Sequence, residues 1–179
     1  MRVVVQRVKS ASVTTTENRK VVSSIGPGIV ALVGLHQRDT PAQLQECCKQ
    51  LLSCKLWEND KGSGWRQSVI QQQFQILLVS QFTLYGTTSR KGTMDYQSAM
   101  KTEPARTMYD QFVSMVREAY EAKLQNSGKK DQEPPYPASE RVMDGVFGAM
   151  MEVELVNDGP VTLVLESEPP LEQEIAADS

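Results

Sequence analysis

Residues 157–162, with the sequence Asn-Asp-Gly-Pro-Val-Thr, constrain the fold most, because they join two strand-like runs through a glycine and a proline. Asp-Gly between alternating apolar runs is a strong hairpin signal, since glycine reaches the positive φ that such turns require. Proline cannot donate to a ladder, so Pro160 must lie at an edge, a bulge or a displaced backbone segment. The Gly159-Pro160 bond is also a candidate for the cis isomer. We predict an unusual turn between strands at residues 146–156 and 161–167.

Strand signals also open the chain and recur near its middle. Residues 2–9, 20–25 and 29–35 read as strands, and a Gly-Pro-Gly turn separates the last two, which predicts a small meander. Residues 74–84 are apolar on both faces, as is typical of a central strand. The polar residues of this strand come at its carboxyl end, where a site is able to open.

Two helices are expected from capping signals followed by helical periodicity. Residues 39–41 (Asp-Thr-Pro) and 102–104 (Thr-Glu-Pro) each place a capping residue before a proline. Apolar residues then recur at helical spacing over residues 41–56 and from residue 102 to about residue 123. The length of 179 residues suits one domain with a core of its own.

The remaining segments have the composition of surface chain. Residues 126–139 hold three prolines, a glycine and paired lysines, so we expect a mobile insertion there. Residues 168–179 form an acidic tail that we expect to be disordered, which leaves a domain at residues 1–167. No apolar run reaches the roughly 18–20 residues that span a bilayer, and we expect a cytoplasmic protein.

The charge distribution bears on a nucleic-acid partner. Of the 22 acidic side chains four lie in residues 167–179, which leaves 18 acidic against 19 basic side chains in the body. A strongly basic, non-specific binder is therefore excluded, whereas a local phosphate-contacting patch is permitted. Candidates for such a patch, each of which is equally explained as solvated surface, are Arg2, Arg7, Lys9, Arg90, Lys91, Lys101 and Arg106.

Side chains for conventional hydrolysis are scarce. His36 is the only histidine, and no serine or cysteine near it forms a known nucleophile signature, so a structural role is favoured over a general base. Cys47, Cys48 and Cys54 lack metal-ligand spacing and read as free thiols. No metal-binding motif or phosphate loop is present, and we expect neither a metal nor a cofactor. Any catalysis must use backbone groups, hydroxyls or the substrate itself.

Two motifs together resemble the signature of the D-aminoacyl-tRNA deacylases, the D-tyrosyl-tRNA deacylase family. They are Ser-Gln-Phe-Thr-Leu at residues 80–84 and Asn-Asp-Gly-Pro-Val-Thr at residues 157–162. The resemblance covers nearly the whole chain. It extends to residues 1–8 (Met-Arg-Val-Val-Val-Gln-Arg-Val), 28–34 (Gly-Ile-Val-Ala-Leu-Val-Gly), 90–92 (Arg-Lys-Gly) and 146–149 (Val-Phe-Gly-Ala).

This resemblance implies a fold and an activity. The fold would be an α/β single compact domain, with a mainly antiparallel sheet or open barrel, two principal helices and a homodimeric assembly. Gly159 and Pro160 would form a Gly-cisPro dipeptide that enters the pocket of the other subunit. The family hydrolyses the ester that joins a D-amino acid, or glycine, to the terminal adenosine of tRNA. L-amino acids would be excluded because their side chains are driven into the dipeptide.

The roles implied for residues 80–83 follow the same resemblance. Ser80, Gln81 and Phe82 would line the pocket for the terminal adenosine and the ester. Thr83 either attacks as a nucleophile or lies in a stretch whose backbone amides form an oxyanion hole while the adenosine 2′-hydroxyl assists, and we favour the latter. Without a direct role, Thr83 is equally well explained as a β-branched strand residue and Phe82 as a core aromatic. Phe82 would otherwise stack on adenine.

Three departures from the family pattern and two rival interpretations remain. Met150 stands where many relatives carry an aspartate or tyrosine, residues 93–97 lack an expected proline, and the 126–139 insertion is long. The first two bear on the pocket rim and on substrate preference.

One rival interpretation is a nucleic-acid-binding module that lost the reaction. The other is a related proofreading deacylase with a trans Gly-Pro bond.

Overall fold

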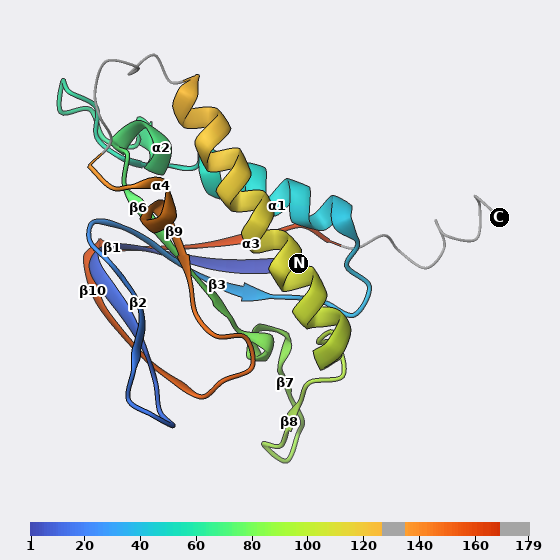
Figure 1. Ribbon diagram of the computed structural model, residues 1–179. Coiled ribbons are helices and arrows are strands. Elements are labelled where there is room, and N and C mark those ends of the chain that lie inside the picture. The colour runs from blue at the N-terminus through green and yellow to red at the C-terminus, as the bar shows by residue number, and fades with distance from the viewer. Residues whose placement is uncertain (127–134, 169–179) are drawn as a thin grey trace, which may run out of the picture.

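The computed structural model describes residues 1–126 and 135–168, which form one α/β domain (Figure 1). The predicted insertion at 126–139 lies largely outside the described residues, and so does all of the predicted tail except Glu168. In chain order the elements are β1 (Arg2–Thr15), β2 (Val21–Ile25), β3 (Gly28–Gly34), α1 (Pro41–Ser53), β4 (Lys55–Trp57), β5 (Gln67–Ser68), α2 (Val69–Gln72), β6 (Gln75–Ser80), the 3₁₀ turn η1 (Phe82–Tyr85), β7 (Thr87–Thr88), β8 (Met94–Asp95), α3 (Thr102–Gln125), α4 (Ala138–Arg141), β9 (Val142–Asp144) and β10 (Met151–Glu166).

A six-stranded sheet organises the domain, in the order β10-β1-β3-β6-β9 with β2 also paired to β1. The predicted meander is wrong, because β2 and β3 do not pair with each other. The 14-residue β1 is long enough for both: residues 2–8 pair with β3 and residues 11–14 pair with β2. Pairs around β1 are antiparallel, whereas β3-β6 and β6-β9 are parallel, so the sheet is mixed.

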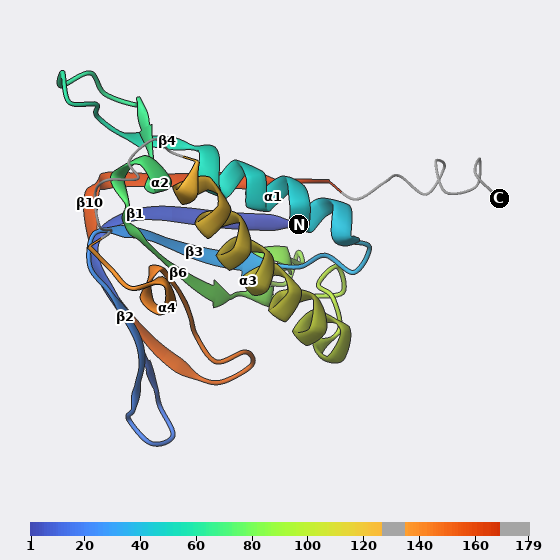
Figure 2. The ribbon, with the colours of Figure 1, turned by 45° about the horizontal axis from the view of Figure 1, so that its top comes forward.

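The sheet curls until its ends are tied together. Figure 2 shows β2 and the first half of β10 bending away from the plane of β3 and β6. The Ser23 hydroxyl of β2 donates a 2.6 Å hydrogen bond to the carbonyl of Asp144 in β9, at the far edge of the sheet. The sheet is therefore nearly closed, which confirms the predicted open barrel with two principal helices.

The central strand is β6, which is buried on both faces as predicted. Ile76 and Leu78 pack into the cluster beneath the helices, whereas Leu77 and Val79 pack into a second cluster on the opposite face. The strand ends at Ser80 rather than continuing to residue 84. The reason is local: the Gln81 N–H donates a last ladder bond of 2.7 Å to the carbonyl of Val33, and the chain then turns into η1.

Helices α1 and α3 lie together over one face of the sheet (Figures 1 and 2). Helix α1 begins as predicted, with Thr40 as N-cap in a capping box and proline at the first position. It ends at Ser53, so Leu56, expected in this helix, lies in β4. Helix α3 begins at Thr102 and continues to Gln125, with Lys101 at the cap position. Both helices bury their apolar stripes against β1, β3 and β6.

The end of the chain differs most from prediction. Residues 151–166 form a single strand, β10, that pairs with β1 on both sides of Gly159-Pro160, so the predicted hairpin does not exist. Because β1 continues past this point, it pairs with β10 both before and after the dipeptide. The chain therefore runs straight on instead of folding back. The irregularity appears instead as register shifts between Gln6 and Val8 and between Val8 and Ser10. Pro160 thus lies in an edge strand beside a bulge, where a missing N–H is tolerated.

In the part of the chain that the structure describes, no helix has the length and apolar character needed to cross a bilayer.

Candidate functional site

The Ser-Gln-Phe-Thr motif forms a turn at the carboxyl end of the buried strand β6. The first backbone bond of the turn runs from the Leu84 N–H to the Gln81 carbonyl, at 3.3 Å, and the next from the Gly86 N–H to the Thr83 carbonyl, at 2.9 Å. The N–H groups of Phe82 and Thr83 come before this ladder and have no carbonyl within the turn to bind. Two adjacent backbone donors are therefore presented at the end of a fixed strand.

Close backbone approaches hold this turn in place. A Cβ atom added to Gly34, at the end of β3, would lie 3.0 Å from the Leu84 Cβ and 3.2 Å from the Gln81 carbonyl oxygen. A Cβ added to Gly86 would lie 2.7 Å from the ring of Tyr96. The two glycines allow β3 and the segment after β8 to pack directly against the turn, which a larger residue would displace.

The aromatic ring of Phe82 lies on the surface. Its side chain is 59% exposed and contacts Tyr96 edge-on, with ring centroids 5.1 Å apart. A core role for Phe82 is therefore wrong, because the strand ends before it. Tyr96 belongs to residues 93–97, in which a proline is expected from the resemblance, and the structure brings this segment directly against the motif.

Thr83 has the surroundings of a positioned hydroxyl rather than those of an activated nucleophile. It is exposed, and its hydroxyl oxygen accepts a hydrogen bond from the side-chain amide of Gln81. An amide is not a base, so this contact orients the hydroxyl without drawing off its proton.

His36 and the three cysteines make other contacts. The His36 ring packs edge-on against Tyr85 at 5.1 Å, and its Nδ1 accepts from the Arg38 N–H. Burial is the largest influence on its pKa and lowers it, against an opposing effect of Asp39, so the ring is neutral near pH 7. Burial raises the pKa of each cysteine thiol to about 11, which leaves almost no thiolate at neutral pH. The thiols are free, as expected.

The second motif is held by Arg7 of β1. Its guanidinium Nε lies 3.1 Å from both the carbonyl oxygen and the carboxylate Oδ2 of Asp158, and Nη1 donates to the carbonyl of Leu56. The next residue, Gly159, has φ +125°, and a Cβ there would lie 2.8 Å from the Val161 side chain. Only glycine adopts this backbone readily. The Gly159-Pro160 bond is cis, and both residues are exposed.

The structure separates the two motifs within one subunit. Ser80 of β6 pairs with Val33 of β3, which in turn pairs with Val3 of β1. Gly159-Pro160, by contrast, lies opposite Arg7 of β1. This separation is four residues along β1 and three strand spacings across the sheet, or roughly 13 Å along and 14 Å across. Of the predicted site residues, Ser80, Gln81, Phe82 and Thr83 are therefore together, and Gly159 and Pro160 are distant from them.

Two residues against the turn were missed as site residues in the sequence. Tyr96 follows a two-residue strand that carries no usable pattern. Arg2 lies far away in the chain, at the start of β1, and its guanidinium reaches the turn by donating to the Leu84 carbonyl at 2.7 Å. Arg2 was recognised only as a possible phosphate contact, and no signal in the sequence indicated this bond.

Among residues 1–126 and 135–168, no group of three or more histidine, cysteine, aspartate or glutamate residues is placed to hold a metal ion. Residues 80–83 supply backbone donors, the hydroxyls of Ser80 and Thr83 and the side-chain amide of Gln81. Chemically, this arrangement is suited to stabilising negative charge that develops on an oxygen atom.

The fold and this turn define a single-domain α/β protein whose candidate site consists largely of main-chain groups. Residues 4–166 match the model of the family described as D-Tyr-tRNA(Tyr) deacylase, and the chain belongs to this family, which confirms the prediction. A D-aminoacyl-tRNA deacylase of Shouchella clausii is 40% identical over 168 residues, which cover 94% of this chain and 100% of the relative. The Drosophila melanogaster protein of the same name is 39% identical, with 93% and 92% covered. D-aminoacyl-tRNA deacylase 1 of Homo sapiens is 37% identical, with 95% and 72% covered.

Solved structures agree on the fold. One described as a c-Myc DNA Unwinding Element Binding Protein superposes with a TM-score of 0.77 at 38% identity, and covers 94% of this chain and 99% of its own. Another, described as a probable eukaryotic D-amino acid tRNA deacylase, has a TM-score of 0.73 at 21% identity, with 92% and 97% covered. The second likeness concerns the fold alone.

Proposed function

We propose that this protein hydrolyses the ester of D-aminoacyl-tRNA and of glycyl-tRNA mischarged on a non-cognate tRNA, releasing the free amino acid and the tRNA. Water adds to the ester carbonyl, a tetrahedral oxyanion forms, and the bond to the ribose oxygen of the terminal adenosine breaks as that oxygen takes up a proton. The observation that carries the proposal is the pair of backbone donors at Phe82 and Thr83, in a chain of the D-Tyr-tRNA(Tyr) deacylase family.

In this proposal the two amides form the oxyanion hole. Donors fixed to a strand end need no reorganisation when charge develops, and each such donor is worth about 10²–10³ in kcat. Ser80, Gln81 and Phe82 line the pocket, and the exposed Phe82 ring offers a face on which adenine stacks. The adenosine 2′-hydroxyl assists the reaction, because the Thr83 hydroxyl is bound to an amide rather than to a base.

Gly159 and Pro160 of a second subunit complete the pocket. Their distance from the turn within one subunit means that a shared pocket needs two chains. Backbone atoms placed against the α-carbon of the substrate leave room for hydrogen on that side but not for a side chain. An L-amino acid is thereby rejected by its own side chain, whereas glycine and D-amino acids fit.

The edge strand β10 supplies a surface for a homodimer. Its Val153, Val156 and Val164 are exposed, and Met150 just before it is 78% exposed. An edge strand with exposed apolar side chains is a pairing surface that a monomer ordinarily avoids. A second copy of this chain covers these residues and also supplies the missing dipeptide, so one assembly accounts for both.

The decisive assay compares three esters on tRNA. Purified protein is incubated with D-tyrosyl-, L-tyrosyl- and glycyl-tRNA, and ester loss is followed against a protein-free control. We expect rapid loss of the D-tyrosyl and glycyl esters, while the L-tyrosyl ester decays at its spontaneous rate. Equal turnover of the L ester, or no turnover of any ester, would refute the proposal.

A non-catalytic nucleic-acid-binding role is the second candidate, favoured by the description of one structural neighbour as a DNA-unwinding-element-binding protein. The same preparation separates the two candidates. Retention of single-stranded nucleic acid without loss of any tRNA ester would support this second role. Ester hydrolysis that continues in the presence of excess single-stranded DNA would support the enzyme.

A further inference from the structure

Arg2 is the side chain that ties the turn η1 to the sheet. Its Nη1 donates to the Leu84 carbonyl at 2.7 Å, and the guanidinium carbon lies 5.2 Å from the centre of the Tyr85 ring. One guanidinium therefore contacts two consecutive residues of a four-residue turn. Its planar shape allows this, since it donates in its plane and stacks on its face.

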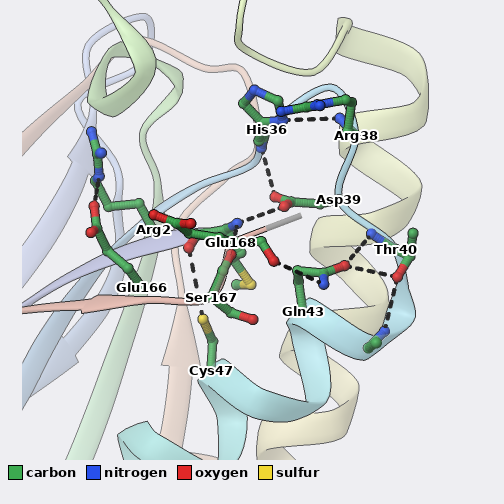
Figure 3. Close-up of polar contacts among 12 residues, drawn as sticks. Arg2, His36, Arg38, Asp39, Thr40, Gln43, Cys47, Glu166, Ser167 and Glu168 are labelled. Carbon is green, nitrogen blue, oxygen red and sulfur yellow. Dashed lines mark hydrogen bonds and ion pairs between the residues drawn. The ribbon is translucent and has the colours of Figure 1, made fainter. Parts of the chain in front are cut away.

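Glu166 holds the guanidinium in this place. Arg2 and Glu166 are direct partners across the β1-β10 ladder, and the Arg2 Nε pairs with the Glu166 carboxylate, as Figure 3 shows. The same residues line a hollow of about 280 Å³ that Tyr85 and His36 also border. The Glu166 carboxylate thus fixes the arginine from the side of β10, and the arginine fixes the turn.

Among the polar side-chain contacts of the turn, only those of Arg2 come from β1. Every residue of η1 is at least partly exposed, and its N-cap Gln81 makes no side-chain capping bond. Besides the Arg2 contacts, the turn is held by two backbone bonds and by close packing at Gly34 and Gly86. The Gln81–Thr83 side-chain bond and the ring contacts of Phe82 with Tyr96 and of Tyr85 with His36 complete the set among the described residues. A shift of the turn would move the Phe82 and Thr83 amides, and charge stabilisation falls steeply when donors are misplaced.

We propose that Arg2 is a positioning residue for the reaction, which holds η1 so that the amides of Phe82 and Thr83 point at the substrate oxyanion. This inference rests on the proposed function. Arg2 and Glu166 are 39% and 46% exposed, so their ion pair adds little to the free energy of unfolding. Loss of Arg2 is expected to lower the rate rather than unfold the protein.

The test uses Arg2→Met, which keeps the length of the side chain but removes its charge and donors. A small residue at position 2 would promote removal of Met1 during expression, and Met1 is buried, so alanine is unsuitable. Arg2→Lys keeps the charge without the planar fork. Arg66→Met, at an exposed arginine before β5, is the matched control.

For Arg2→Met we expect kcat on D-tyrosyl-tRNA to fall by about tenfold or more, because a charged hydrogen bond to the turn is lost. KM should stay within about twofold of wild type. Arg2→Lys recovers part of the rate, and Arg66→Met matches wild type. The midpoint of thermal unfolding shifts by only a few degrees. Amide exchange at Leu84 and Gly86 speeds up in Arg2→Met, whereas exchange at Gln81, bound to Val33, does not.

Two failures are distinguishable. A wild-type protein that hydrolyses no D-tyrosyl-tRNA would overturn the proposed function, and the role of Arg2 with it. An active wild type with unchanged kcat and unchanged amide exchange in Arg2→Met would overturn the role of Arg2 alone. A loss of rate that follows the unfolded fraction, with no recovery in Arg2→Lys, would also overturn it.

Discussion

The two signature motifs are presented in opposite ways. Residues 80–83 lead from the end of β6, a strand buried on both faces, into a turn in which no residue is buried. Gly159 and Pro160 lie in the middle of β10, an edge strand, where a bulge and Arg7 set the path of the chain. The first motif is positioned by a core and the second by a surface irregularity.

This difference shows how a site made of backbone atoms is kept rigid. The end of a buried strand is held in place by the packing of the strand in the core, so it needs few residues of unusual backbone conformation. The edge strand β10 is paired on one side only, and at residues 158–160 a glycine with positive φ and an arginine contact also set its path. The two motifs lie at different levels of one sheet, so only a second copy brings them together in the proposed pocket.

Removing one backbone donor is expected to have the largest effect. Phe82→Pro deletes the Phe82 N–H at the first position of η1, where proline is tolerated. We expect kcat to fall by about 10²–10³, as for loss of an oxyanion donor. Phe82→Ala is the control, because it keeps the N–H and loses only the ring. Measured on D-tyrosyl-tRNA, it should raise KM and leave kcat close to wild type. Equal kcat in Phe82→Pro and Phe82→Ala would contradict a backbone oxyanion hole.

A side chain at Gly159 is the corresponding change in the other motif. In Gly159→Ala the new Cβ meets Val161 and the backbone has φ +125°. The strain, about 2–3 kcal/mol, is relieved when residues 158–160 move. Because this movement displaces the dipeptide from the proposed pocket, we expect kcat/KM to fall by roughly 30- to 100-fold. Gly64→Ala, where nothing lies within 4 Å, should match wild type. Full activity of Gly159→Ala would show that this segment does not form part of the pocket.

Removing the Thr83 hydroxyl is expected to have a small effect. Thr83→Ala loses a group bound by an amide, so we expect kcat/KM within about threefold of wild type, the scale of one modest hydrogen bond. Single-turnover kinetics on D-tyrosyl-tRNA measure this. A fall to the uncatalysed rate in a folded protein would instead identify Thr83 as the nucleophile.

His36, behind the turn, should have the smallest effect on rate. Its pKa is lowered by burial, so the folded protein binds fewer protons than the unfolded chain and stability is lost as the pH falls below about 6.5. His36→Gln should flatten this acid-side loss in denaturant titrations and leave kcat nearly unchanged between pH 6.5 and 8. An inflection in kcat that disappears in His36→Gln would indicate a general base.

Much of the fold could be predicted from local signals. The Thr40-Pro41 cap, the helical periodicity of α1 and α3, and the two-sided burial of β6 depend on neighbouring residues, and all three were correct apart from their ends. The course of β10 depends on how far β1 continues, a non-local fact, so Asp-Gly misled the prediction into a hairpin. The pairing of β2 and β3 with different halves of β1 was missed for the same reason.

In the candidate site, too, the local motif could be predicted and the contacts from distant segments could not. Ser80 to Thr83 could be named because the motif is contiguous, and the family match supports the resemblance that identified it. The roles of these residues and of Gly159-Pro160 stay predictions. Arg2 and Tyr96 reach the turn from distant segments, and a single sequence holds no record of such contacts.

Subunit complementation tests the central claim, a pocket shared between two chains, most directly. Phe82→Pro and Gly159→Ala chains carrying different tags are co-expressed, and the doubly tagged heterodimer is purified. In a shared pocket one site of this heterodimer carries both lesions and the other carries none, so we expect about half of wild-type activity from two nearly inactive parents. A heterodimer no more active than its parents, or a protein that elutes as a 19.9 kDa monomer, would contradict the account.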